Sequence, residues 1–302
     1  MKTCVILNPR AGSAQTILES LRRALDRLDE LEIRETDAAG GARALAARAV
    51  EEGFDRLVAA GGDGTLNEVL NGLAPDFDRA ELGLVPAGTG NDLARTLGIP
   101  LDPERAVEVV ASGAVRKLDV ARLHAGGEDR WFLNVSAGGF SGEVDEGLKA
   151  EFKESWGPLS YLRTAFEAAT ELETYDARLT FEPGTSDEES LRLDAVNVVV
   201  ANGRYVGGGL HVAPTAAPDD GLLDVVVIHA APIARLSLLA PRVAIGAHLG
   251  HELVEHRRAR SLEVRSDPPM PFNADGEPIG STPVRYQVLP KAVRFLAPPE
   301  EL

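Results

Sequence analysis

The chain has 302 residues, of which 44% are hydrophobic, and this is enough to form two cores of ordinary size. Its formal net charge of −16 argues against a nucleic-acid partner, and its single cysteine, Cys4, excludes a disulfide framework. No apolar run reaches the roughly 18–20 residues that span a bilayer, and no charged and then apolar leader opens the sequence. We therefore expect a cytoplasmic protein, soluble or peripheral to the inner membrane face, that contacts anionic lipid only through a local basic patch.

Strands and helices are expected to alternate over the first 110 residues. Apolar strands lead into turns that carry glycine, and each turn is followed by residues with helical hydrophobic spacing. This alternation predicts an α/β domain with a parallel sheet, in which the loops after the strands converge on one crevice. The expected strands are 3–7, 33–36, 57–60 and 82–85, and the expected helices cover leucines 18–28, residues 41–50, 65–73, 93–97 and 103–110.

The stretch Leu57–Leu70 is the clearest expected binding site. A buried strand leads through Gly61-Gly62-Asp63-Gly64 into a helix that begins at Thr65. This order suits an anion, because the glycines allow close backbone approach and the first-turn N–H groups point at the ligand. Asp63 would repel a phosphate unless a divalent cation lay between them. The alternative is a plain turn in which Asp63 caps its own helix.

A change in the sequence pattern after residue 119 predicts a second domain. Short β-type runs and turns rich in Gly, Pro and Asp indicate an antiparallel sandwich over 123–288, after a first domain of 1–122. Residues 289–302 form a tail that could return to the first domain through a strand at Ala292–Leu296. Helices are expected at Leu159–Leu172 and Ile233–Glu255, the second with a charged outer face. This second helix carries a cluster of residue types that bind zinc, namely His248, His251, Glu252, Glu255 and His256. The cluster does not match the H-E-x-x-H spacing of a zinc site, because position 255 is Glu.

Several motifs together resemble those of the bacterial diacylglycerol kinases and related lipid kinases, which share a catalytic-domain fold with sphingosine and ceramide kinases. The specific combination is GGDGTLNEV at Gly61–Val69, PAGTGNDLAR at Pro86–Arg95 and DGE at Asp275–Glu277. GGDGT alone is less specific, since NAD kinases and phosphofructokinases are similar there. Further markers extend the resemblance over nearly the whole chain: the N-P-x-[SA]-G turn at Asn8–Gly12, Lys117–Asp119, GPLSYL at Gly157–Leu162 and the segment Gly207–Asp224.

The resemblance implies an N-terminal domain like that of NAD kinase and phosphofructokinase, a β-sandwich-like C-terminal domain, and nucleotide in a cleft between them. The implied activity is transfer of the γ-phosphate of ATP to the hydroxyl of diacylglycerol or a related lipid alcohol, with Mg²⁺. Arg10 joins the nucleotide contacts because its guanidinium could reach a phosphate. The implied nucleotide contacts are Asn8, Arg10, Thr36, Gly61, Gly62, Asp63, Gly64, Thr65, Leu66, Asn67, Glu68, Thr89 and Asn91.

Three catalytic roles follow from the same resemblance. Asp63 would position the Mg²⁺-bound triphosphate, Asp119 would join the metal and water network, and Glu277 would accept the proton of the lipid hydroxyl. A second, structural Mg²⁺ is implied in the turn before residue 224, for which a plain Asp-Gly turn is the alternative. Its ligands would be Asp220 and the backbone carbonyls of Ala217 and Leu222.

The lipid substrate is expected at a membrane surface. Lys149 and Lys153 lie beside apolar bulk in the segment 148–162, which suits a membrane-facing lip, and Arg257, Arg258 and Arg260 form a second basic cluster. Core packing and solvated charges are the alternative for both. A soluble kinase of the NAD kinase type and a non-catalytic nucleotide- or lipid-binding relative are the competing functions. The choice of lipid and the oligomeric state, a homodimer included, stay open.

Overall fold

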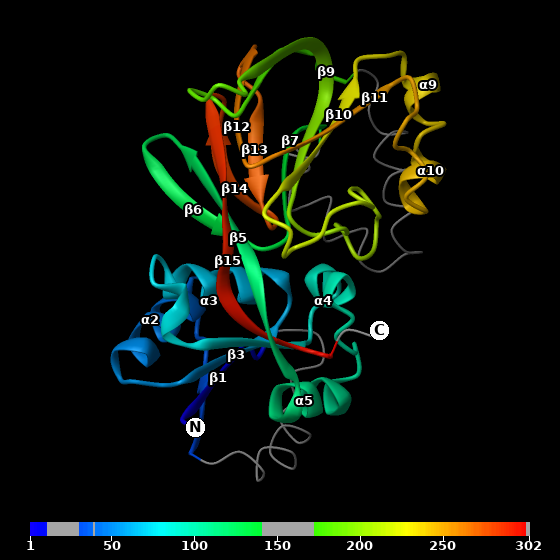
Figure 1. The fold of residues 1–302 in the computed structure, drawn as a ribbon. Coiled ribbons are helices and arrows are strands. Elements are labelled where there is room, and N and C mark those ends of the chain that lie inside the picture. Colours follow the sequence, from blue (N-terminus) through cyan, green and yellow to red (C-terminus); the bar gives the residue numbers. More distant parts are fainter. Residues whose placement is uncertain (11–29, 39, 141–171, 300–302) are drawn as a thin grey trace. The chain divides into compact units, whose positions relative to one another are not determined.

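The computed structural model describes residues 1–10, 30–38, 40–140 and 172–299, and the chain divides into two compact units (Figure 1). Unit 1 combines Met1–Val120 with Pro290–Leu302, and unit 2 is Ala121–Leu289. The long strands β5 (Ala114–Ala125) and β15 (Val284–Ala297) each contribute residues to both units.

Some expected features lie outside the described residues. These are the helix over leucines 18–28, residues 159–171 of the helix expected at Leu159–Leu172, and the segment with Lys149 and Lys153. None of the helices in the described ranges combines the length and the apolar character that crossing a membrane requires.

Unit 1 contains a parallel sheet with helices packed on it, as the strand–helix alternation predicts. Its elements are β1 (Thr3–Leu7), β2 (Leu31–Glu35), α2 (Gly41–Glu51), β3 (Arg56–Gly61), α3 (Asp63–Leu73), the 3₁₀ turn η1 (Phe77–Arg79), β4 (Glu81–Pro86), α4 (Asp92–Leu97) and α5 (Pro103–Ser112). The strand order is β2-β1-β3-β4, with every pairing parallel. Every residue of β1, β3 and β4 is buried, which is typical of parallel strands covered on both faces.

The last long strand, β15, pairs with β4 at the edge of this sheet. Phe295 in β15 pairs in parallel with Leu82 in β4. The sequence indicates a separate strand at Ala292–Leu296, but β15 runs without a break from Val284 to Ala297. Lys291 has a positive φ of 53° inside the strand, and its N–H donates to Asp119 Oδ1 at 2.7 Å.

Unit 2 is built from antiparallel strands, and this confirms the predicted class of a parallel α/β domain followed by a β-sandwich-like domain. Every strand pairing that lies within the described part of this unit is antiparallel. Its elements besides β5 and β15 are β6 (Glu128–Phe132), β7 (Val135–Gly139), β8 (Tyr175–Phe181), β9 (Glu189–Ala201), β10 (Leu223–His229), α9 (Ile233–Leu236), α10 (Ala240–Ala244), β11 (Val254–Ala259), β12 (Ser261–Asp267), β13 (Pro271–Ala274) and β14 (Glu277–Ser281).

The strand β9 has apolar cores on both of its faces. Val198 and Val200 pack with one buried cluster, and Val199 and Ala201 pack with another that includes Leu236 of α9. Successive side chains of a strand point to opposite faces, so this division shows that the sheet is covered on both sides. The α9–α10 segment therefore forms part of one cover.

The prediction of one helix over Ile233–Glu255 is wrong. The segment forms two short helices and then the strand β11, in which His256 pairs with Val226 of β10. Gly246 and Gly250 have φ of 71° and 80°, outside the helical region, so the chain turns there. The expected charged helix face therefore does not exist. Among the described residues, no group of three or more His, Cys, Asp or Glu side chains is arranged to hold a metal ion.

Candidate functional site

Three loops of unit 1 line one pocket of about 220 Å³. They follow β1, β2 and β3, and because these strands run parallel, the loops after them lie at the same edge of the sheet. The pocket brings together six of the expected nucleotide contacts. Its lining consists of Asn8, Arg10, Thr36, Asp37, Ala38, Ala42, Gly64, Thr65 and Glu68.

Asn8 and Arg10 connect the loop after β1 to both neighbours. The Asn8 side-chain amide donates to Thr65 Oγ1 at 3.4 Å, while Asn8 Oδ1 accepts the Arg10 N–H at 3.0 Å. The exposed Arg10 side chain reaches across to donate from Nη2 to the carbonyl of Asp37 at 3.2 Å. A guanidinium group has five N–H donors, so this contact leaves donors for an anion in the pocket.

Glu68 lines the pocket and fixes the start of α2. Its Oε1 accepts the N–H of Gly40 at 3.0 Å, and its Oε2 accepts the N–H of Ala42 at 2.9 Å. These N–H groups lie at the positive end of the α2 dipole, where a carboxylate is stabilised. The negative charge of Glu68 is therefore already compensated by the protein.

Asp63 binds the start of α4. Its Oδ2 accepts the N–H of Asp92 at 3.1 Å, and its Oδ1 accepts the N–H of Leu93 at 3.2 Å. The N-cap residue of α3 is Gly62, which makes no side-chain cap, so the alternative that Asp63 caps its own helix is wrong. Asp63 joins the β3–α3 loop to the β4–α4 loop.

The glycines between these loops have a packing role. A Cβ atom on Gly88 would lie 2.6 Å from Gly62 Cα, and one on Gly61 would lie 2.4 Å from Thr65 Oγ1. The Ala87 N–H also donates to Gly61 O at 2.8 Å. The two loops therefore approach one another too closely for a side chain at position 88, while a side chain at position 61 would meet Thr65 of its own loop.

Several expected contact residues lie around these loops and do not line the pocket. Leu66 packs in the core, and Asn67 is buried, with its Oδ1 accepting from the Asn71 side chain at 3.1 Å. Asn91 exchanges two hydrogen bonds with the backbone of Gly88, at 2.7 and 3.0 Å. Thr89 is exposed between them.

The two other expected catalytic residues lie in different units. Asp119 is fully buried in unit 1, where it accepts the Lys291 N–H. Glu277 is exposed in unit 2, at the start of β14 after a turn formed by Asp275 and Gly276. The turn is fixed because Asp275 Oδ1 accepts the Val135 N–H at 2.9 Å. The catalytic role of each stays a prediction.

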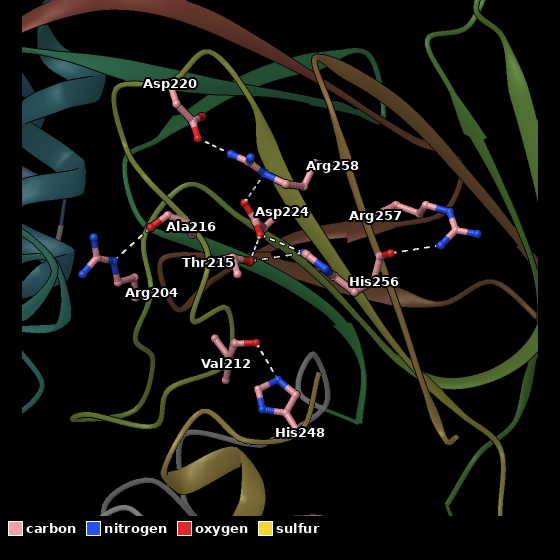
Figure 2. A network of polar contacts seen from close by, with 10 residues as sticks. All are labelled: Arg204, Val212, Thr215, Ala216, Asp220, Asp224, His248, His256, Arg257 and Arg258. Atoms are coloured by element: carbon pink, nitrogen blue, oxygen red, sulfur yellow. Dashed lines mark hydrogen bonds and ion pairs between the residues drawn. The ribbon is translucent and has the colours of Figure 1, made fainter. Parts of the chain in front are cut away.

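The turn expected to bind a second Mg²⁺ is occupied by an arginine side chain (Figure 2). The Arg258 guanidinium forms an ion pair with Asp220, whose Oδ1 accepts the Leu222 N–H at 3.0 Å. The Ala217 carbonyl accepts the Asp220 N–H at 3.4 Å. In this arrangement the Arg258 guanidinium pairs with the only carboxylate among the three expected ligands, and the Mg²⁺ site in this turn stays a prediction.

Asp224 stands at the centre of the same network and is fully buried (Figure 2). Burial alone would raise the pKa of Asp224, but contacts with His256 Nε2 at 2.8 Å, the Thr215 hydroxyl and Arg258 Nε at 3.2 Å outweigh it. The pKa therefore lies below its usual value. Arg257 pairs with Glu255, so two guanidinium groups of the expected basic cluster are in ion pairs.

Sequence reasoning missed part of this arrangement. Asp37, Ala38 and Ala42 line the pocket, and the signal that could have found them is the polar turn ending in Gly40-Gly41 after β2. The contact between Asp224 and Arg258 has no local signal, because the two residues are 34 positions apart.

Two family models match the chain. Residues 2–123 match the diacylglycerol kinase catalytic domain, and residues 135–297 match the domain described as the YegS C-terminal NAD kinase beta sandwich-like domain. Together they cover both units, and they confirm the family indicated by the sequence motifs.

Similar proteins and structures agree with these matches. The chain is 30% identical to a Staphylococcus saprophyticus protein named diacylglycerol kinase, over 97% of this chain and 94% of that protein. It is 32% identical to a Stenotrophomonas maltophilia protein named "Probable lipid kinase YegS-like", over 97% and 95%. A crystal structure of a diacylglycerol kinase from Bacillus anthracis superposes with a TM-score of 0.82 at 30% identity, covering 99% of this chain and 97% of that one. This chain belongs to the family of diacylglycerol kinases and YegS-like lipid kinases.

Proposed function

We propose that this protein transfers the γ-phosphate of ATP to the hydroxyl group of diacylglycerol or a related lipid alcohol. The observation that carries the proposal is the unit 1 pocket, whose lining brings together Arg10 and five residues that the family motifs associate with nucleotide. Membership of the family supports kinase activity, and the phosphate donor and the lipid acceptor are our proposals.

The pocket has the donors that a nucleotide phosphate needs. Gly64 and Thr65 lie in the first turn of α3, where backbone N–H groups lack partners inside the helix. Arg10 adds a positive charge and a planar set of N–H donors. Glu68 does not cancel this attraction, because its two oxygens are bound by backbone N–H groups of α2.

Mg²⁺ would supply charge neutralisation and alignment of the phosphates. Kinase sites hold this ion through one or two carboxylates together with water and substrate phosphates, so a cage of protein ligands is not required. Asp63 fits this role, because two backbone N–H groups orient its carboxylate and each oxygen has a further lone pair. We assign Asp119 to the surrounding hydrogen-bond network.

Glu277 is our proposed proton acceptor. A lipid hydroxyl has a high pKa and is a poor nucleophile until its proton is removed. As the bond from the hydroxyl oxygen to phosphorus forms, the bond from the γ-phosphorus to the bridging oxygen breaks and ADP leaves. The hydroxyl proton passes to the Glu277 carboxylate.

The test is a labelled-ATP assay with a panel of acceptors. Purified protein, Mg²⁺ and γ-labelled ATP are incubated with diacylglycerol, sphingosine, phosphatidylglycerol or NAD, and the labelled products are separated. We expect label in the phosphorylated product of a lipid alcohol, and diacylglycerol is the first choice. Transfer to NAD alone would assign a soluble small-molecule kinase, and ATP binding without transfer to any acceptor would assign a non-catalytic relative.

A matched pair of variants guards against a contaminating kinase. Asp63→Asn should reduce transfer strongly, because it removes the oriented charge. Asp76→Asn changes an exposed aspartate outside the pocket lining and should retain the wild-type rate. Equal rates for the two variants would mean that the activity does not depend on the β3–α3 loop.

A further inference from the structure

The carboxylate of Asp37 belongs to the lining of the unit 1 pocket and has no assigned role. Asp37 follows β2, and its side chain is exposed. The Arg10 guanidinium donates to the Asp37 carbonyl oxygen at 3.2 Å, and no hydrogen bond or ion pair from residues 1–10, 30–38, 40–140 or 172–299 reaches the Asp37 carboxylate. An ionised carboxylate only accepts hydrogen bonds, so a ligand group that faces it must be a donor.

The nearby N–H groups at the start of α2 bind other acceptors. A Cβ atom on Gly41 would lie 3.3 Å from Asp37 Oδ1, so the carboxylate lies beside the first residue of α2. The Gly41 N–H donates to the Ala38 carbonyl at 3.1 Å, and Glu68 accepts the N–H groups of the residues on either side. The donors of this helix start are therefore occupied, and the Asp37 carboxylate keeps its lone pairs for a ligand.

The donors that suit phosphate come from the other two loops of the pocket. Arg10 follows β1, and Gly64 and Thr65 lie in the first turn of α3, after β3. Neighbouring strands lie about 4.8 Å apart, so in the order β2-β1-β3 the loop after β2 lies one strand spacing from the first of these loops and two from the second. Phosphate is attracted to the β1 and β3 loops and repelled by Asp37. A ligand that fills the pocket therefore presents anionic groups to those loops and uncharged donors to Asp37.

We propose that Asp37 accepts hydrogen bonds from the ribose hydroxyls of the nucleotide and so selects ribonucleotides over deoxyribonucleotides. Ribose is the part of a nucleoside triphosphate that adjoins the phosphates, and it carries two neighbouring hydroxyl donors. A carboxylate can accept from both of them, as acidic side chains do from ribose in the dinucleotide-binding α/β folds. The amino group of adenine is the other donor, and it lies beyond the ribose, further from the phosphates. The proposal rests on the proposed function in one respect, that the pocket takes ATP.

The test is calorimetric titration of the full chain with ATP, 2′-deoxy-ATP and 3′-deoxy-ATP, in the presence of Mg²⁺ and without lipid. We expect the wild-type protein to bind ATP about five- to tenfold more tightly than at least one deoxy analogue, because that analogue lacks a hydrogen bond to Asp37. In Asp37→Ala the affinity for ATP should fall to that for the analogue. The affinity for the analogue itself should not fall, since it does not make the lost bond.

Matched variants separate recognition of the ribose from a structural role. Glu35→Ala removes an exposed carboxylate at the end of β2, outside the pocket lining, and should keep the wild-type preference for ATP. Asp37→Asn keeps a side-chain oxygen acceptor in nearly the same shape and should keep part of the preference. Inosine triphosphate has both ribose hydroxyls but lacks the adenine amino group, so in Asp37→Ala it should lose the same factor in affinity as ATP.

Several results would overturn the proposal. They are equal wild-type affinities for ATP and both deoxy analogues, an unchanged preference in Asp37→Ala, or an equal loss for all three nucleotides in that variant, which a structural role would give. A loss seen with ATP and absent with inosine triphosphate would assign Asp37 to the adenine amino group instead. Each of these results leaves the kinase assignment intact. The expected preference without transfer to any acceptor counts against the kinase assignment alone, and the absence of binding by every nucleotide counts against both.

Discussion

Asp63 and Glu68 are carboxylates in a region that has the donors for an anion. Each accepts two backbone N–H groups from the start of a neighbouring helix, Asp63 from α4 and Glu68 from α2. Hydrogen bonds to a charged group contribute about 1.5–3 kcal/mol each, so these charges are stabilised locally. The two residues hold three helix starts in a fixed arrangement, and the pocket depends on that arrangement as well as on its lining.

Glu277→Gln tests the proposed proton acceptor. Glutamine has nearly the same shape as glutamate but cannot take the hydroxyl proton, so we expect kcat to fall by about 10²–10⁴. ATP binding should be unchanged, because the variant leaves the unit 1 pocket intact. The measurements are steady-state kinetics and calorimetric titration with nucleotide. Glu189→Gln, at an exposed glutamate of the same unit, is the control, and full turnover by Glu277→Gln would remove this residue from the role.

His248 makes the stability of unit 2 dependent on pH. The side chain is 1% exposed and its Nε2 lies 3.0 Å from the Val212 carbonyl (Figure 2). Burial lowers the pKa of His248 below its usual value of about 6.5, so the folded protein resists a proton that the unfolded chain accepts. The stabilisation is fully present above about pH 6.5 and declines as the pH falls below it.

We therefore expect the free energy of unfolding to decrease between about pH 7 and pH 5.5. Urea unfolding at a series of pH values measures it. His211 contributes in the same direction, since burial and then the charge of Arg204 lower its pKa. His248→Gln should flatten the dependence, and an equally steep dependence in this variant would exclude His248 as a source.

At the scale of elements, an arginine side chain links the β10–β11 pair to the turn before β10. Arg258 in β11 bridges the Asp220 turn to Asp224 in β10. If the guanidinium makes Mg²⁺ unnecessary, adding Mg²⁺ without nucleotide should leave the Tm of the wild-type protein unchanged. Arg258→Met should lower the Tm, because it leaves the buried Asp224 charge with fewer partners, at a cost of about 1–3 kcal/mol.

Mg²⁺ should restore part of that Tm in Arg258→Met, and the restoration should disappear when Asp220→Asn is added. Differential scanning calorimetry with and without Mg²⁺ measures both effects. A wild-type Tm that rises with Mg²⁺ and loses this rise in Asp220→Asn would show that the turn binds the ion despite Arg258.

The sequence predicted the elements that depend on local pattern. The parallel strands of unit 1 and the buried face of α3 follow from apolar runs and helical spacing, and both are confirmed. The helix expected at Ile233–Glu255 is wrong, because hydrophobic spacing does not show that Gly246 and Gly250 adopt positive φ. The strand β11 was not predicted from the sequence, because it consists largely of charged residues and a histidine.

The candidate site was predictable in its position and less so in its contacts. Parallel strands bring successive loops to one edge, so the gathering of Asn8, Thr36 and Thr65 follows from the strand order. That Asp63 would bind the N–H groups of Asp92 and Leu93 depends on the distance between two loops, and no local pattern in the sequence reports it. Tertiary contacts of this kind require the folded backbone.

At the scale of the whole molecule, the net charge affects the stability of the fold. The chain has 47 acidic and 31 basic residues, so repulsion between like charges destabilises the folded state. Salt screens this repulsion. We expect the urea midpoint of unfolding to rise between about 10 mM and 300 mM NaCl.

The response to salt separates the effect of the net charge from that of individual ion pairs. If salt weakened folding, ion pairs such as that of Arg192 with Asp176 would outweigh the net repulsion. A sodium chloride titration of the urea midpoint decides whether net repulsion or local ion pairs dominate the stability.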